Sequence, residues 1–68
     1  MTTDIDKEKL THLLEHWIEH NQNHSKSFRE WANRVTEAGH EELAEDIKAA
    51  EKKMDECSDV LKRARNKL

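Results

Sequence analysis

The 68-residue chain contains no proline and a single glycine, Gly39, near its middle. Proline and glycine are the residues that most often interrupt helices, so two long uninterrupted segments flank one candidate turn. Glycine can adopt the left-handed conformation that ends a helix. The sequence therefore predicts a single helical domain over residues 1–68, with helices over about 4–38 and about 41–67 and the turn at Gly39.

Apolar residues recur at alternating steps of four and three on both sides of Gly39, which is the heptad spacing of helices that pack lengthwise on one another. The first series is Leu10, Leu14, Trp17, Asn21, His24, Phe28, Trp31, Val35 and Ala38, and the second is Leu43, Ile47, Ala50, Met54, Cys57, Leu61, Ala64 and Leu68. A tight turn makes the two helices antiparallel and pairs Asn21 with Cys57. We therefore expect an all-α fold, an antiparallel helical hairpin of two long helices.

The segment Asn21–Ser27 competes with this fold, because most of its residues are poor helix formers that together cost about 2–3 kcal/mol relative to alanine. A break there gives the alternative, a three-helix bundle. The helix after Gly39 is expected to be about 42 Å long, and two short helices beside it would leave its last turns without partners. Chain length thus favours the hairpin.

A chain of this length buries only about 60% of its unfolded surface, so its core needs reinforcement. Cys57 is the only cysteine, so a disulfide within the chain is excluded, and a metal or self-association remains. A second apolar set flanks the two series and would stay in water in a lone hairpin. It comprises Leu13, Ile18, Ala32, Ala44 and Val60. We expect a homodimer that buries this set in a four-helix bundle, although surface apolar residues are also common.

Composition limits the function classes. The net charge of −3 gives no footprint for nucleic acid, and the basic residues near the C-terminus suit the end of a helix. A lone thiol, no bilayer-length apolar stretch and no signal-peptide pattern predict a cytoplasmic protein that does not bind membranes. The sequence has no nucleophile–base pair and no phosphate-binding loop, so we expect no enzymatic activity.

Histidines recur at every fourth position from His12 through His16 and His20 to His24. Residues four apart lie on one helix face with Cβ atoms about 5–6 Å apart, and two imidazoles so placed can hold one metal ion. Four residues turn a helix by about 400°, so the ladder drifts by about 40° per step. This drift predicts that His12 and His16 face solvent, His20 flanks the packed seam and His24 lies in it.

His20 and His24 are therefore expected to reach toward Met54 and Cys57 of the second helix. Imidazoles with sulfur suit Zn, Ni, Co or Cu(I). His12 and His16 would supply a weaker, exposed second site. The alternative is that the histidines are tolerated in solvent, with His24 a polar residue that fixes helix register and Cys57 a small core residue.

Three segments resemble a family of small uncharacterised His-rich helical domains of anaerobic bacteria and archaea, sometimes joined to nickel-handling proteins. The residues that carry the resemblance are His16-Trp17-Ile18-Glu19-His20-Asn21 with His24, Phe28-Arg29-Glu30-Trp31-Ala32, and Gly39-His40-Glu41-Glu42-Leu43-Ala44. The resemblance spans Leu10 to Leu61. It implies metal handling and points to His16, His20 and His24.

Two functional hypotheses follow. The first is a small cytoplasmic protein that binds a transition-metal ion through the histidine ladder, for storage, delivery or sensing. The second is a helical interaction or dimerisation module that pairs with itself or with a protein partner. In the second, no metal is bound and His24 acts as a register residue or a pH-sensitive residue.

Overall fold

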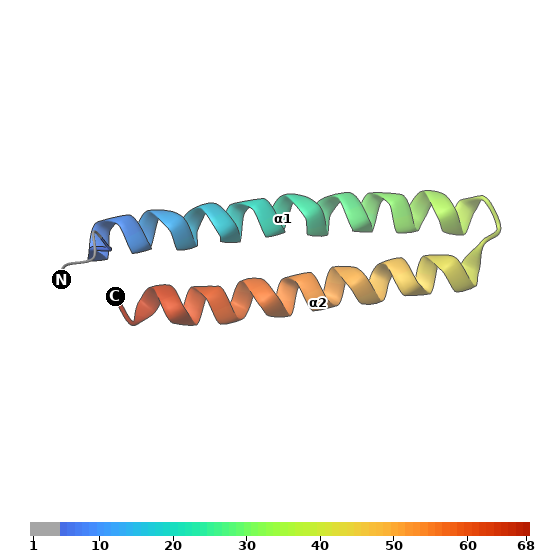
Figure 1. The fold of residues 1–68 in the computed structure, drawn as a ribbon. Coiled ribbons are helices and arrows are strands. Elements are labelled where there is room, and N and C mark those ends of the chain that lie inside the picture. Colours follow the sequence, from blue (N-terminus) through green and yellow to red (C-terminus); the bar gives the residue numbers. More distant parts are fainter. Residues whose placement is uncertain (1–4) are drawn as a thin grey trace.

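The computed structural model describes residues 5–68, which form two antiparallel α-helices joined by a short turn (Figure 1). Helix α1 spans Lys7–Glu37 and helix α2 spans Glu41–Asn66. The start of α1 and the end of α2 lie at one end of the hairpin, and the turn lies at the other. The predicted antiparallel hairpin is confirmed. The three-helix alternative is wrong, because α1 continues without a break through the polar segment 21–27.

Helix α1 begins after Asp6, whose side chain accepts a hydrogen bond from one of the free backbone N–H groups of the first turn. The carboxylate of Asp6 accepts a hydrogen bond of 2.8 Å from the backbone N–H of Lys9, as an N-cap residue does. The helix start predicted at Asp4 lies outside the described residues. The helix end predicted at Ala38 is one residue late, because α1 ends at Glu37 and Ala38 caps it.

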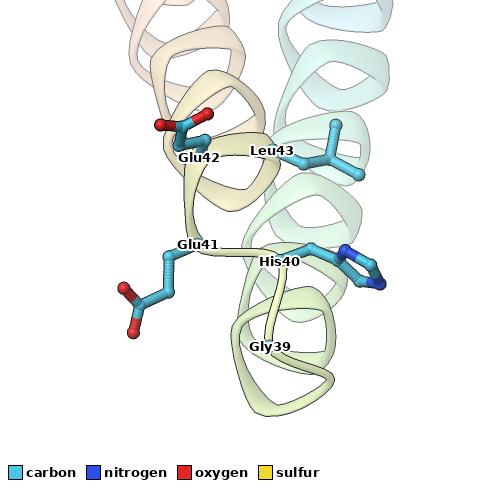
Figure 2. Close-up of a pocket in the computed structure, with 5 residues that line it drawn as sticks. All are labelled: Gly39, His40, Glu41, Glu42 and Leu43. Atoms are coloured by element: carbon cyan, nitrogen blue, oxygen red, sulfur yellow. The ribbon is translucent and has the colours of Figure 1, made fainter.

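The turn depends on the conformation of Gly39, whose φ is +92°. The backbone N–H of Gly39 donates to the carbonyl of Thr36 at 3.0 Å, and that of His40 donates to the carbonyl of Val35 at 3.0 Å. This pair of bonds is the Schellman arrangement that closes a helix around a left-handed residue. The single glycine therefore ends α1 and reverses the chain (Figure 2).

The helices meet along a narrow seam whose most buried members are small. Ser25, Ala32, Ala44 and Ser58 are buried, together with Ile18. Helix axes approach according to the side chains between them, so alanine and serine allow α1 and α2 to lie close together. Larger half-buried residues complete the seam: Leu14, Asn21, Phe28 and Val35 on α1, and Ile47, Met54, Leu61 and Leu68 on α2.

This seam differs from the predicted one at every second position. The structure places Ile18, Ser25 and Ala32 between the helices, where the sequence pattern placed Trp17, His24 and Trp31. One residue is a rotation of about 100° on a helix, so the predicted residues point out of the seam. As a result, Trp17 is 44% exposed and Trp31 is 55% exposed.

The second apolar set is also placed differently from the expectation. Ile18, Ala32 and Ala44 were expected to stay in water in a lone hairpin, but they form the buried core between α1 and α2. Only Leu13 and Val60 of that set are exposed. The residues that need covering are therefore largely others, above all the two tryptophans.

Two polar contacts fix the alignment of the helices. The guanidinium of Arg29 donates to the carboxylate of Glu51 at 2.7 Å, and this hydrogen bond and the charge of Glu51 raise the pKa of Arg29. The amide of Asn21 donates to the sulfur of Cys57 at 3.6 Å, which confirms the predicted pairing of those two residues. Along the hairpin axis, Arg29 is thus level with Glu51, and Asn21 is level with Cys57.

Candidate metal centre

One hollow on the described surface lies at the turn and brings together no residues from separate parts of the chain. It has a volume of about 510 Å³ and is lined by five consecutive residues, Gly39 to Leu43. The side chains of Glu41 and Glu42 point to the opposite side from the His40 imidazole (Figure 2). Since no residue from elsewhere in the chain contributes, this hollow is a bend in the surface rather than a binding site.

The histidine ladder lies on the outside of α1, and all four of its members are exposed. Its closest contact joins His20 and His24, whose Nε2 atoms are 3.0 Å apart. Their rings meet edge to face, with centroids 4.6 Å apart and an interplanar angle of 75°. The continuous helix through segment 21–27 produces this contact, because only unbroken helix keeps residues four apart on one face.

Neighbouring rings extend the ladder in both directions. The His16 ring stacks on His20 with centroids 6.4 Å apart, and the Phe28 ring stacks on His24 at 6.0 Å. His16 and His20, with Glu19 and Asn23, line a shallow hollow of about 110 Å³. His16 is therefore a neighbour of the pair whose ring lies parallel to His20 rather than converging with it.

The His20–His24 distance suits two kinds of interaction. Without metal, one ring can donate its Nε2–H to the Nε2 lone pair of the other, which requires opposite tautomers. With a metal–nitrogen bond of about 2.0–2.1 Å, two nitrogens 3.0 Å apart subtend about 94° at the ion. This angle is close to the right angle of neighbouring ligands in square-planar and octahedral sites. A small rotation of either ring gives the tetrahedral angle that zinc prefers.

The structure does not bring the predicted sulfur ligands to this pair. Cys57 is exposed and accepts the Asn21 hydrogen bond, and Met54 is half-buried in the seam. Within residues 5–68, no three His, Cys, Asp or Glu side chains gather closely enough to hold one ion. Within one chain, the Nε2 atoms of His20 and His24 lie together, whereas Cys57, His12 and His16 do not add a third ligand to them.

The structure has a further surface, formed by residues that the sequence pattern assigned to the seam. Five of its eight members directly precede a buried seam residue, and the other three precede the half-buried Thr11, Glu51 and Arg65, so all point about 100° away from the opposite helix. We call this surface the tryptophan face. It consists of Leu10, Trp17, His24 and Trp31 on α1, and Leu43, Ala50, Cys57 and Ala64 on α2. Because α1 and α2 are antiparallel, a step of one residue toward the N-terminus rotates a side chain out of the seam to the same side on both helices, so both sets lie on one side of the hairpin.

The tryptophan face explains why His24 and Cys57 do not converge within one chain. His24 and Cys57 both lie about 100° away from the seam, on the same side of two adjacent antiparallel helices. The Cys57 sulfur turns across to the amide of Asn21, a seam residue, and not to His24. The seven-residue spacing of Trp17, His24 and Trp31 indicates that they share one face of α1. Apolar character alone does not show whether that face or the neighbouring one with Ile18, Ser25 and Ala32 is buried.

The fold and the paired imidazoles define a helical hairpin with an exposed two-histidine site. The chain belongs to a family described as a domain of unknown function, DUF8180, whose model matches residues 10–68. It is 44% identical over 57 residues to an uncharacterised protein of Archaeoglobus fulgidus, an alignment that covers 84% of this chain and 90% of that protein. No solved structure matches the chain.

These comparisons confirm part of the resemblance inferred from the sequence. The chain is a member of an uncharacterised domain family with an archaeal relative, as expected. Neither description mentions histidine or nickel. Neither helix in the described part of the chain has the length and apolar character needed to cross a bilayer.

Proposed function

We propose that this hairpin binds a transition-metal ion, Ni, Zn, Co or Cu, through the Nε2 atoms of His20 and His24. The role is storage, delivery or sensing of that ion, without a catalytic step. The observation that carries the proposal is the 3.0 Å separation of the two Nε2 atoms. Two exposed histidines with no joint task would have many other rotamers available, whereas this arrangement directs both metal-binding atoms at one point.

The surroundings of the pair support ion binding. Both rings are at the surface, so an ion can reach them without opening the seam. The Phe28 ring restricts His24 on one side and the His16 ring restricts His20 on the other. Neighbours that hold a metal-binding histidine in place raise its affinity, because less side-chain freedom is lost on binding.

The members of the ladder are not equivalent in this proposal. His20 and His24 form the primary site, and His16 together with His12 forms a weaker, more exposed one. A stacked pair such as His16 and His20, with centroids 6.4 Å apart, must rotate before both nitrogens meet one ion. His12 lies four residues before His16, farther from the primary site, and is therefore the control for any test of that site.

Calorimetric titration of the metal-free protein with each of the four ions tests the proposal. We expect binding heat with at least one ion in the wild type and in His12→Ala. We expect affinity at least tenfold lower in His24→Ala, because one of two ligands is gone. Both substitutions remove an exposed helical histidine, so they are matched. No heat with any ion, or equal losses in the two variants, would overturn the proposal.

A second candidate function is favoured by the exposure of the tryptophan face. A large apolar patch on a small protein commonly marks a protein interface. Under this alternative, the hairpin is an interaction or dimerisation module and its histidines bind no ion. It predicts association that is independent of added metal, whereas the primary proposal predicts metal binding that depends on His24.

A further inference from the structure

We propose that the tryptophan face binds a second copy of this chain, and that Cys57 of the second copy completes the His20–His24 site. The metal-binding half of this inference rests on the proposed function. The pairing half does not, since it follows from the exposed surface of the hairpin.

The exposed area of the chain is too large for a compact monomer. The accessible surface is 5634 Å² for a mass of 8.1 kDa. A typical folded monomer of that mass exposes about 4,500 Å², so this chain exposes about 1,100 Å² more. A standard dimer interface buries about 800 Å² on each partner. The excess is therefore of the size that pairing with one further copy would remove.

The tryptophan face has the composition of such an interface. Trp31, Trp17 and Leu43 are each about half exposed, at 55%, 44% and 54%. Aromatic residues are enriched at interfaces and charged residues are depleted at interface cores. The eight residues that define the face include two tryptophans and none with a permanent charge. Two copies of a chain with a net charge of −3 can therefore meet there without a charged residue among the eight that define the face.

The shape of the face selects one way of pairing. Its α1 stripe is bulky, with Trp17 and Trp31, and its α2 stripe is small at Ala50, Cys57 and Ala64, with Leu43 near the turn. Facing layers pack well when large side chains meet small ones. A two-fold axis parallel to the helices places α1 of one copy over α2 of the other, so the tryptophans of one copy meet mainly the small residues of the other. A two-fold axis across the helices stacks the tryptophan stripes on each other and holds the alanine stripes apart.

This symmetry also fixes which residues meet. Rotation about an axis parallel to the helices does not move a residue along that axis. Because Cys57 is level with Asn21 in its own chain, Cys57 of the second copy is also level with Asn21 of the first. That level lies between His20 and His24. The thiol contacts Asn21 within its own chain, and rotation of the Cys57 side chain away from that contact directs it toward the histidine pair of the opposite chain.

The completed site has two imidazoles and one thiolate, with a fourth position open to water or a partner ligand. This set suits Zn or Co in tetrahedral geometry. The thiol loses its proton to solvent when the ion binds. Two such sites form per dimer, one on each side of the two-fold axis. Residues 5–68 of one chain hold no three-ligand site, whereas the proposed pair contains two.

Sedimentation of the metal-free protein tests the pairing half. We expect a dimer for the wild type and for Glu30→Lys, and a monomer for Trp31→Lys. Glu30 and Trp31 are both exposed and adjacent on α1, but only Trp31 belongs to the face. Circular dichroism checks that helicity is retained. A wild-type monomer at high concentration overturns the pairing, and so does a Trp31→Lys dimer that remains intact.

Cobalt spectra test the completed site through subunit mixing. Cys57→Ser retains the histidines and the double variant His20→Ala/His24→Ala retains the thiol, so neither alone should give the thiolate-to-cobalt charge-transfer band. After exchange of the two variants, we expect about a quarter of the wild-type intensity, because half the dimers are mixed and each has one intact site.

The outcomes separate this inference from the proposed function. No band after mixing, together with a wild-type band, means that the site forms within one chain and overturns the inference. Cobalt binding in the wild type without any thiolate band leaves the histidine pair as the site and also overturns the inference. Absence of cobalt binding altogether overturns the metal half, while the sedimentation result still decides the pairing.

Discussion

Asn21 and Cys57 lie opposite each other across the hairpin, with the Asn21 amide nitrogen 3.6 Å from the Cys57 sulfur. This contact locates the thiol beside the His20–His24 pair along the hairpin axis. The thiol turns toward Asn21, a seam residue, and not toward the histidines. One chain thus contains the sulfur and nitrogen ligands on its two helices without bringing them together, and the proposed second copy is what makes them converge.

Bound metal should stabilise the fold. An ion that binds only the folded state adds about 2.7 kcal/mol at a free concentration of a hundred times Kd. We expect this gain in the wild type and in His12→Ala, and its loss in His24→Ala, whose Nε2 atom lies 3.0 Å from that of His20. Thermal unfolding with and without the ion measures it. A wild-type melting temperature that ignores the ion would contradict the proposed function.

Replacing Ser25 with alanine should stabilise the hairpin. The hydroxyls of Ser25 and Ser58 are buried and have no hydrogen-bond partner among residues 5–68. A buried polar group without a partner costs about 1–3 kcal/mol, and alanine is also the better helix former. We expect Ser25→Ala to gain about 1 kcal/mol or more in denaturant unfolding. Half-buried Ser27 is the control, with an expected gain from helix propensity of about 0.5 kcal/mol.

Replacing Gly39 should destabilise the turn through the backbone alone. Its φ of +92° is unfavourable for a residue with a Cβ, yet a Cβ there would meet no described atom within 4 Å. We expect Gly39→Ala to lose about 1 kcal/mol of unfolding free energy. Gly39→Asn should lose less, because asparagine tolerates the left-handed region. Equal losses in the two variants would mean that something other than φ governs this position.

The fold was largely predictable from the sequence because its signals are strong and local. A single glycine between two long helical segments, with no proline, fixes the turn at Gly39. The rotation of the helices was not predictable. A pattern of apolar residues predicts that Trp17 and Trp31 are buried between the helices. In the structure α1 and α2 instead pack through Ala32 and Ser25, because small residues allow the helices to approach closely.

The candidate site was predictable in its spacing but not in its geometry. A four-residue interval places His20 over His24 on any continuous helix, and the structure brings them together. The distance between their Nε2 atoms depends on rotamers, which the sequence does not specify. Cys57 is separated from the pair because both helices are rotated relative to the prediction. The same rotation is the reason that the predicted seam residues differ from the observed ones.

Nitrogen NMR of the histidine rings during a zinc titration tests the central claim most directly, because it observes the proposed ligand atoms themselves. We predict that the Nε2 resonances of His20 and His24 shift together and saturate first, while the ring nitrogens of His12 shift only at higher zinc and those of His40 stay unchanged. Ring resonances that do not move, or that move equally in all five histidines, would contradict a metal site at His20 and His24.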